Sequence, residues 1–317
     1  MKTIISVDGG GIKGIVAITI LQAIQSKLPK PIHEYVDCFA GTSTGGLIAA
    51  GLTAPDEEGK PKFTTDDLVE VYRTLGPDVF DRSFWHKVKT LWGLIGPKFP
   101  LDGLQKVSED KFGTTALKEC LTHVVIATYD LVTRSPVVFD STEPKLNGIS
   151  VVDACMGTAS VPTMFPSIKS GGYNLIDGGI FACSPTLCAL AVCKERYPDE
   201  TYMVISVGTG DYNESLPHDK TAGWGLLNWG STAVDVILDG IGDGVDQQAK
   251  IFTESANGVY HRLQFKIPKE FSAMDDPSPE NVDGLRQKTL EYIKKNEEVI
   301  NKVCQQLILI EAGKFKE

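Results

Sequence analysis

Residues 4–14 read Ile-Ile-Ser-Val-Asp-Gly-Gly-Gly-Ile-Lys-Gly, and residues 36–47 read Val-Asp-Cys-Phe-Ala-Gly-Thr-Ser-Thr-Gly-Gly-Leu. In both stretches a short apolar run typical of a buried strand ends in glycines, and an apolar helical pattern follows. A strand–turn–helix order that occurs twice near the start of a chain is typical of α/β folds. These two stretches therefore predict parallel strands whose carboxyl ends carry glycine-rich turns.

The same alternation of strands and helices continues along the chain. Further strands are expected at residues 124–128, 137–139, 175–176, 203–207 and 259–267. Helices are expected at residues 15–28, 47–52, 64–75, 151–159 and 185–196, with Ser184 as the N-cap of the last, and at 226–255, with a break near Gly240–Gly244. We predict a three-layer α/β/α sandwich with a mostly parallel central sheet. It forms a single domain over residues 1–317, with an amphipathic helical segment at about 281–312 packing on it.

The composition excludes several classes of protein. The 317 residues are 42% hydrophobic and 23% charged, with a net charge of −10, which excludes a disordered tail, a collagen and a coiled-coil rod. So acidic a chain is not expected to bind nucleic acid or to dock on anionic lipid by charge alone. The seven cysteines form no C-x-x-C pair and predict buried free thiols. No stretch predicts a signal peptide or a membrane span, so a cytoplasmic location is expected.

Gly41-Thr-Ser43-Thr-Gly45 lies between an apolar strand and an apolar helix. That is the context of a nucleophile elbow, in which a tight turn exposes the serine hydroxyl and the flanking glycines avoid collisions with neighbouring backbone. The following helix directs its N-terminus at the site and stabilises negative charge there. The alternative, a structural glycine-rich turn, is less consistent with this context.

Asp8-Gly9-Gly10-Gly11-Ile12-Lys13-Gly14 follows the first strand and opens a helix. Consecutive glycines let several backbone N–H groups point into one small volume, which creates an anion site. Beside a serine nucleophile, the anion is the oxyanion of acyl transfer. A dinucleotide site is the alternative, with Glu34 near the distance expected for a ribose-binding acid. Against it, the second strand runs into the serine turn instead of ending at that acid.

A carboxylate and the histidines complete the set of chemically informative residues. Asp177-Gly178-Gly179 ends another predicted strand, where a carboxylate can serve as general base. An α/β-hydrolase needs a histidine after its acid, and only His218 and His261 follow Asp177. Neither lies in a catalytic signature, so both are interpreted as ordinary surface or core residues.

Taken together, the three motifs resemble those of the patatin-like phospholipases. Other segments resemble plant patatins in the same order, namely Gly76-Pro77, Lys98-Phe99, Ser206–Gly210, Lys220–Trp229 and Met274–Asp276. The resemblance implies an α/β/α fold related to cytosolic phospholipase A2, a Ser–Asp dyad without histidine, and no metal or other cofactor. It implies that Ser43 is the nucleophile, Asp177 the base, and the N–H groups of Gly9, Gly10 and Gly11 the oxyanion hole. The supporting motif residues are then Lys13, where many relatives have arginine, Gly14, Gly41, Gly45, Gly178 and Gly179.

The function implied is hydrolysis of fatty acyl esters of phospholipids or related glycerolipids. The alternatives are a non-catalytic lipid-binding or storage protein, and an acyltransferase that uses the same site. The expected partner is lipid at a membrane or micelle surface; any activating small molecule or protein is left open. The aromatic and apolar residues Phe84, Trp85, Trp92, Leu94 and Phe99 form a candidate docking region, or else part of the core.

Overall fold

The computed structural model describes residues 1–74, 76–79 and 97–315. A sheet of eight strands runs through the described part in the order β5-β6-β3-β2-β1-β7-β8, with β4 also paired to β3. The strands are β1 (Lys2–Val7), β2 (Cys38–Thr42), β3 (His123–Asp130), β4 (Ser135–Asp140), β5 (Ile168–Ser170), β6 (Tyr173–Asp177), β7 (Tyr202–Val207) and β8 (Val259–Leu263). Strands β3, β2, β1, β7 and β8 are parallel, whereas β4, β5 and β6 join antiparallel.

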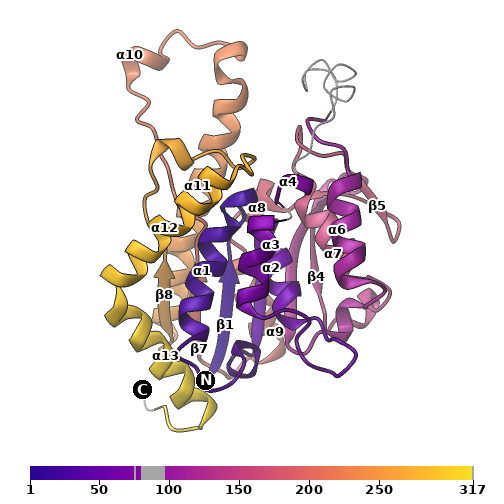
Figure 1. The fold of residues 1–317 in the computed structure, drawn as a ribbon, viewed down its shortest axis with the longest axis vertical. Coiled ribbons are helices and arrows are strands. Elements are labelled where there is room, and N and C mark those ends of the chain that lie inside the picture. Colours follow the sequence, from indigo (N-terminus) through magenta and orange to yellow (C-terminus); the bar gives the residue numbers. More distant parts are fainter. Residues whose placement is uncertain (75, 80–96, 316–317) are drawn as a thin grey trace.

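Helices cover both faces of the sheet (Figure 1). They are α1 (Gly14–Gln25), α2 (Thr44–Thr53), α3 (Thr65–Thr74), α4 (Gly76–Val79), α6 (Asp102–Phe112), α7 (Val151–Ala159), α8 (Gly179–Ala182), α9 (Thr186–Arg196), α10 (His218–Thr221), α11 (Leu226–Ser255), α12 (Pro279–Lys295) and α13 (Glu297–Glu311). The predicted three-layer α/β/α class, with a mostly parallel sheet, is confirmed.

Alternate strand residues build separate cores on the two faces. Ile5 and Phe39 join the larger core, with the apolar sides of α1, α2, α7, α12 and α13. Their chain neighbours Ile4 and Cys38 point the other way and join a smaller core with α9 and α11. This is the period-two alternation of a strand buried on both faces, and it explains why the strands read as continuous apolar runs.

Some local predictions were wrong. Helix α11 continues unbroken from Leu226 to Ser255 through Gly240, Gly242 and Gly244, because glycine costs a helix only about 1 kcal/mol relative to alanine and keeps its backbone hydrogen bonds. Helix α9 begins at Thr186, one residue later than expected, and the Ser184 hydroxyl bonds the Thr186 hydroxyl instead of capping the backbone. The short strand β5 was not predicted at all.

The state of the cysteines and the hydropathy of the helices were also predicted from the sequence. All seven cysteines are free thiols, as expected. Among the described residues, no helix combines the length and the apolar character needed to cross a bilayer.

Candidate active site

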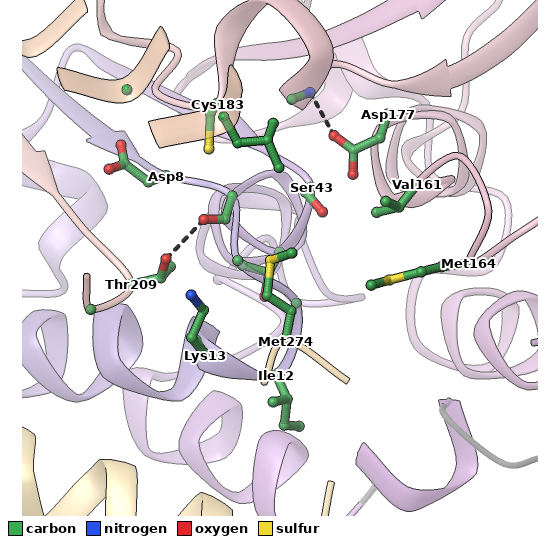
Figure 2. A pocket seen from close by; sticks show the side chains of 18 of the residues that line it. Asp8, Ile12, Lys13, Ser43, Val161, Met164, Asp177, Cys183, Thr209 and Met274 are labelled. Atoms are coloured by element: carbon green, nitrogen blue, oxygen red, sulfur yellow. Dashed lines mark hydrogen bonds between the residues drawn. The ribbon is translucent and has the colours of Figure 1, made fainter. Parts of the chain in front are cut away.

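Strand β3 aligns the segments that carry the predicted nucleophile and the predicted base. Strand β2 runs parallel to β3 and ends where Thr42 pairs with Ala127. Strand β6 runs antiparallel and ends where Asp177 pairs with Thr128, the next position of β3. Because β4 occupies the other edge of β3 over the same residues, β2 and β6 share one edge and meet end to end. Ser43, which follows Thr42, is thereby brought beside Asp177 (Figure 2).

Ser43 occupies a strained turn between β2 and α2. Its φ is 55° and its ψ is −125°, a conformation that a residue with a side chain rarely adopts. The turn closes tightly, because a Cβ at Gly45 would lie 2.1 Å from the carbonyl oxygen of Val7. A Cβ at Gly41 would likewise lie 2.2 Å from the carbonyl oxygen of Gly45. The local geometry is that of a nucleophile elbow.

The Asp177 carboxylate is buried, and only one of its two oxygens accepts a hydrogen bond among the described residues. Oδ1 accepts a hydrogen bond of 2.6 Å from the N–H of Gly179, whereas the buried Oδ2 has no hydrogen-bond partner among the described residues. Burial raises the pKa of Asp177 to about 7, against the lowering effects of the Gly179 N–H and the Ser43 side chain. A carboxyl group with a pKa near neutrality and one oxygen facing a serine is suited to act as general base. Gly178 lies between these residues, close against the carbonyl oxygen of Ala127.

The glycine loop between β1 and α1 lies next to this pair. Gly9 is fixed on both sides, since its N–H donates to the carbonyl oxygen of Cys183 at 2.9 Å and its carbonyl oxygen accepts from the Thr209 hydroxyl at 2.8 Å. Figure 2 shows Thr209 making its bond beside the pocket. The N–H groups of Gly10 and Gly11 have no hydrogen-bond partner among the described residues. Of the three N–H groups predicted to form an oxyanion hole, that of Gly9 already donates to Cys183. Within the described part of the chain, the N–H groups of Gly10 and Gly11 are free to donate to a substrate oxygen.

Gly11 must be glycine at its position. Its φ is +59°, and a Cβ would lie 2.2 Å from the carbonyl oxygen of Met274. That carbonyl accepts the N–H of Ile12 at 2.9 Å, so the segment before α12 holds the loop from outside. The loop is therefore shaped by a distant part of the chain as well as by its own sequence.

Charged and small residues support the loop. The Asp8 carboxylate forms an ion pair of 2.7 Å with Arg262 of β8, whose guanidinium also approaches Asp246 at 3.3 Å. Lys13 points toward the same cavity as Ser43. Gly14 begins α1, where a Cβ would lie 2.2 Å from the Thr44 hydroxyl. These contacts join the first, second and last strands of the sheet around one site.

Ser43, Asp177 and the glycine loop line a cavity of about 1010 Å³. An apolar wall of the cavity comes from α2, from α3 and the residue Phe63 before it, from α6, and from the segment after α7. Its residues are Leu47, Ile48, Phe63, Leu68, Leu104, Val107, Phe112, Val161, Met164 and Phe165. Polar and charged residues, among them Asp211, Glu214, Lys220 and Lys269, line other parts of the cavity. A large cavity with an extensive apolar wall and reactive polar groups is suited to a ligand that has an apolar part.

Neither His218 nor His261 is among the described residues that line this cavity. His261 on β8 bonds Gln306 at 2.7 Å, and His218 lies in α10. Of the candidate docking residues, Phe84, Trp85, Trp92 and Leu94 lie outside the described residues. Phe99 is buried, 2% exposed, and packs on Phe165 with ring centroids 5.5 Å apart, so for this residue the alternative of a core role holds.

Sequence reasoning did not identify three residues that build the site. They are Thr158, whose hydroxyl bonds the N–H of Ser43 at 2.8 Å, Thr209 and Arg262. Thr209 stands in the Ser206–Gly210 segment, which resembles plant patatins and was the one available signal. Thr158 and Arg262 carry no local pattern, since their roles come from tertiary contact alone.

Comparison with known proteins gives a consistent result. A family model described as Patatin-like phospholipase matches residues 5–190. Patatin-like protein 2 of Oryza sativa subsp. indica is 33% identical over 331 residues, covering 90% of this chain and 82% of the rice protein. Patatin-like protein 4 of Arabidopsis thaliana is 31% identical over 328 residues, with coverage of 90% and 82%.

Two further similarities are more distant or shorter. A Solanum tuberosum protein named Probable inactive patatin-3-Kuras 1 is 31% identical over 264 residues, covering 72% of this chain and 68% of its own. The crystal structure of VipD from Legionella pneumophila aligns with 93% of this chain and 67% of its own, at 12% identity and a TM-score of 0.46. With the family model matching more than half of the sequence and close relatives matching most of it, the chain belongs to the patatin-like phospholipase family.

Proposed function

We propose that this protein is a lipid acyl hydrolase that cleaves fatty acyl esters of phospholipids or related glycerolipids through an acyl-enzyme on Ser43. The observation that carries the proposal is the unpartnered carboxylate oxygen of Asp177, buried beside a strained serine at one point of an apolar cavity. Membership of the patatin-like phospholipase family supports the same class of reaction.

In the first half of the reaction, Ser43 Oγ attacks the ester carbonyl carbon while its proton passes to Asp177 Oδ2. Negative charge develops on the former carbonyl oxygen, and the free N–H groups of Gly10 and Gly11 donate hydrogen bonds to it. The N-terminus of α2 adds a favourable field at the same place. The proton on Asp177 then moves to the departing alcohol, which leaves the acyl group on Ser43.

In the second half, Asp177 accepts a proton from water, and the resulting hydroxide attacks the acyl carbon. The same glycine donors stabilise the second oxyanion. Collapse returns the proton to Ser43 and releases the fatty acid. Asp177 performs both proton transfers because its pKa, raised to about 7 by burial, lets it accept and release a proton near neutral pH.

The cavity supports a long acyl chain as the part of the substrate that is bound. Its apolar lining includes Leu47, one turn along α2 from Ser43, and Phe112 of α6. A volume of about 1010 Å³ is at the large end of small-molecule sites, which run to roughly 1,000 Å³. Polar and charged residues such as Asp211, Glu214, Lys220 and Lys269 also line the cavity, so the apolar residues from α2, α6 and the segment after α7 are the part that we assign to the acyl chain.

Two measurements on the full-length protein test the proposal. A fluorophosphonate probe is expected to add one group to the wild type, at Ser43, and none to Ser43→Ala. Mass spectrometry of products from a panel of defined phospholipids and galactolipids is expected to show free fatty acid with wild type and none with Ser43→Ala. Labelling that persists in Ser43→Ala, or a folded wild type inert to the panel and to the probe, contradicts the proposal.

A competition assay distinguishes hydrolysis from acyl transfer to another acceptor. Adding an alcohol or thiol acceptor at rising concentration is expected to leave fatty acid as the main product. Efficient formation of an acylated acceptor at low acceptor concentration would assign the protein to the acyltransferase alternative instead.

A further inference from the structure

A second cluster of reactive side chains lies at the opposite end of the sheet from Ser43. Cys38 and His123 are register partners at the starts of β2 and β3, and Cys193 approaches them from α9. One ligand atom from each of the three residues lies within 4.8 Å of the other two. Because Ser43 follows the carboxyl end of β2 whereas Cys38 begins it, the cluster is separate from the hydrolase site.

The histidine of this cluster is held in the arrangement that protein metal ligands use. The His123 side chain is 6% exposed, and its Nε2 lies 2.7 Å from Oδ1 of Asp140. The carboxylate accepts, so Nε2 carries the hydrogen; Asp140 is itself fixed by the N–H and hydroxyl of Thr142, each at 2.8 Å. The other ring nitrogen, Nδ1, is buried without a hydrogen-bond partner among the described residues. Metal-bound histidines typically donate one ring N–H to a carboxylate and offer the other nitrogen to the ion.

The two sulfur atoms supply the remaining ligands. Both cysteines are free, and Cys38 is fully buried, whereas Cys193 is 3% exposed. Thiolate is the form that binds metal, so each thiol would give up its proton when the ion enters.

We propose that Cys38, His123 Nδ1 and Cys193 bind one zinc-class divalent ion, with Asp140 orienting the histidine and water completing the coordination. Thiolate and imidazole are the ligands that zinc prefers in proteins. Tetrahedral zinc with Zn–S bonds of about 2.3 Å places its ligand atoms about 3.8 Å apart, so a contraction of at most about 1 Å suffices. Two thiolates balance the charge of the ion, so the buried metal–thiolate centre is neutral and the Asp140 carboxylate keeps its own charge beside it.

Metal binding releases two protons and joins distant segments. Each of the two thiols gives up its proton to bind as thiolate, while His123 binds through Nδ1 and keeps its Nε2 hydrogen on Asp140. The ion would then connect β2, β3 and α9, and through Asp140 also β4. Its role is structural, since the reacting atoms of the hydrolase site lie beyond the other end of these strands.

Cobalt titration of the full-length protein tests the site. The protein is kept reduced, stripped with a chelator and titrated with Co²⁺. One equivalent is expected to produce the thiolate-to-cobalt charge-transfer band and the intense visible bands of tetrahedral Co²⁺, and Zn²⁺ is expected to remove them. Octahedral Co²⁺ spectra alone, or no uptake, would overturn the proposal.

Variants assign the ligands. Cys193→Ala is expected to abolish the charge-transfer band, whereas Cys188→Ala, on the same helix outside the cluster, is expected to keep it. Asp140→Asn is expected to retain the band with affinity weaker by about 10- to 100-fold, as for other carboxylates that orient metal-bound histidines. An unchanged titration of Cys193→Ala contradicts the site. Fluorophosphonate labelling of Ser43 reports that each variant is folded.

X-ray absorption of the zinc-loaded wild type decides the matter without any variant. Two sulfur neighbours at about 2.3 Å, with one or two nitrogen or oxygen neighbours, are expected. A shell without sulfur would refute the assignment. A Cys38–Cys193 disulfide found by peptide mass spectrometry, together with no metal uptake after reduction, would show instead that the cysteines are a redox pair.

Discussion

The side-chain hydroxyl of Thr158 accepts a hydrogen bond of 2.8 Å from the backbone N–H of Ser43. The same hydroxyl donates to the carbonyl oxygen of Ala127 at 2.6 Å. A single buried side chain of α7 therefore connects the strained serine to the strand that also pairs with β6. We infer that Thr158 is a positioning residue, which holds Ser43 in its unusual backbone conformation without touching the substrate.

Replacing Thr158 tests that role. Thr158→Val leaves the buried N–H of Ser43 without an acceptor, which costs about 1–3 kcal/mol. We expect kcat/KM on a soluble ester and the rate of fluorophosphonate labelling to fall together by about 10- to 100-fold. Thr158→Ser keeps the hydroxyl and is expected to retain most of both rates. Equal rates in Thr158→Val and wild type would show that the hydrogen bond has no part in catalysis.

The activity should follow the ionisation of Asp177. Burial raises its pKa to about 7, and only the deprotonated form accepts the proton of Ser43. We therefore expect kcat/KM on a soluble ester to rise about tenfold per pH unit below pH 7 and to level off above it. A profile that is flat between pH 5 and pH 8, roughly the range over which this group titrates, would contradict the assigned base.

The same carboxylate should make the fold less stable as the pH rises. Between about pH 4 and pH 7 the folded protein keeps the proton on Asp177 while the unfolded chain loses it, so stability decreases with pH over this window. Asp177→Asn has nearly the same shape and never ionises. At pH 8 we expect it to unfold with a free energy higher by about 1–4 kcal/mol, and at pH 4 with little difference. Urea denaturation at both values measures this, and an equal loss of stability at both would disprove the reasoning.

The glycine loop should tolerate no side chain at Gly11. An added Cβ would collide with the carbonyl oxygen of Met274, and a φ of +59° is strained for alanine. We expect Gly11→Ala to lower kcat by about 10²–10³, as loss of one oxyanion donor does elsewhere. Gly59→Ala is the matched control, because its φ is +75° but no atom lies within 4 Å of the new Cβ. Measurable binding of NAD or ATP by calorimetry would favour the dinucleotide alternative.

Catalysis should not depend on histidine. His261→Ala removes a ring that bonds Gln306, and His218→Ala removes one from α10, so both are expected to retain most of the wild-type activity. If either variant is as inactive as Ser43→Ala while its circular dichroism stays native, a Ser-His-Asp triad must replace the dyad.

Local sequence signals predicted most of the fold and the centre of the site. The apolar run before Gly41 and the one before Gly9 are strands because they are buried on both faces, and the glycines that follow are forced by backbone contacts. Asp177 was proposed as the base because Asp177-Gly178-Gly179 ends a predicted strand and accompanies the other two motifs, and its role stays a prediction.

The site features that could not be predicted depend on contacts between segments that are distant in the sequence. Thr158 acts through hydrogen bonds to two other segments, and an isolated threonine in a helix gives no signal for them. The occupied N–H of Gly9 depends on Cys183, which lies far away in the sequence. Cys38, His123 and Cys193 show no metal-ligand spacing, because each comes from a different element of secondary structure.

The end-to-end meeting of β2 and β6 along β3 has a consequence for how the protein gains activity during folding. Neither β2 nor β6 brings Ser43 and Asp177 together by itself, because both strands must first pair with β3. The pairing of Asp177 with Thr128 also closes a loop of the chain between β3 and β6. Non-local pairings of this kind form slowly, whereas helices form early. On dilution from denaturant, far-ultraviolet ellipticity should therefore recover before the proposed hydrolase activity, so the rate at which that activity returns would report completion of the sheet.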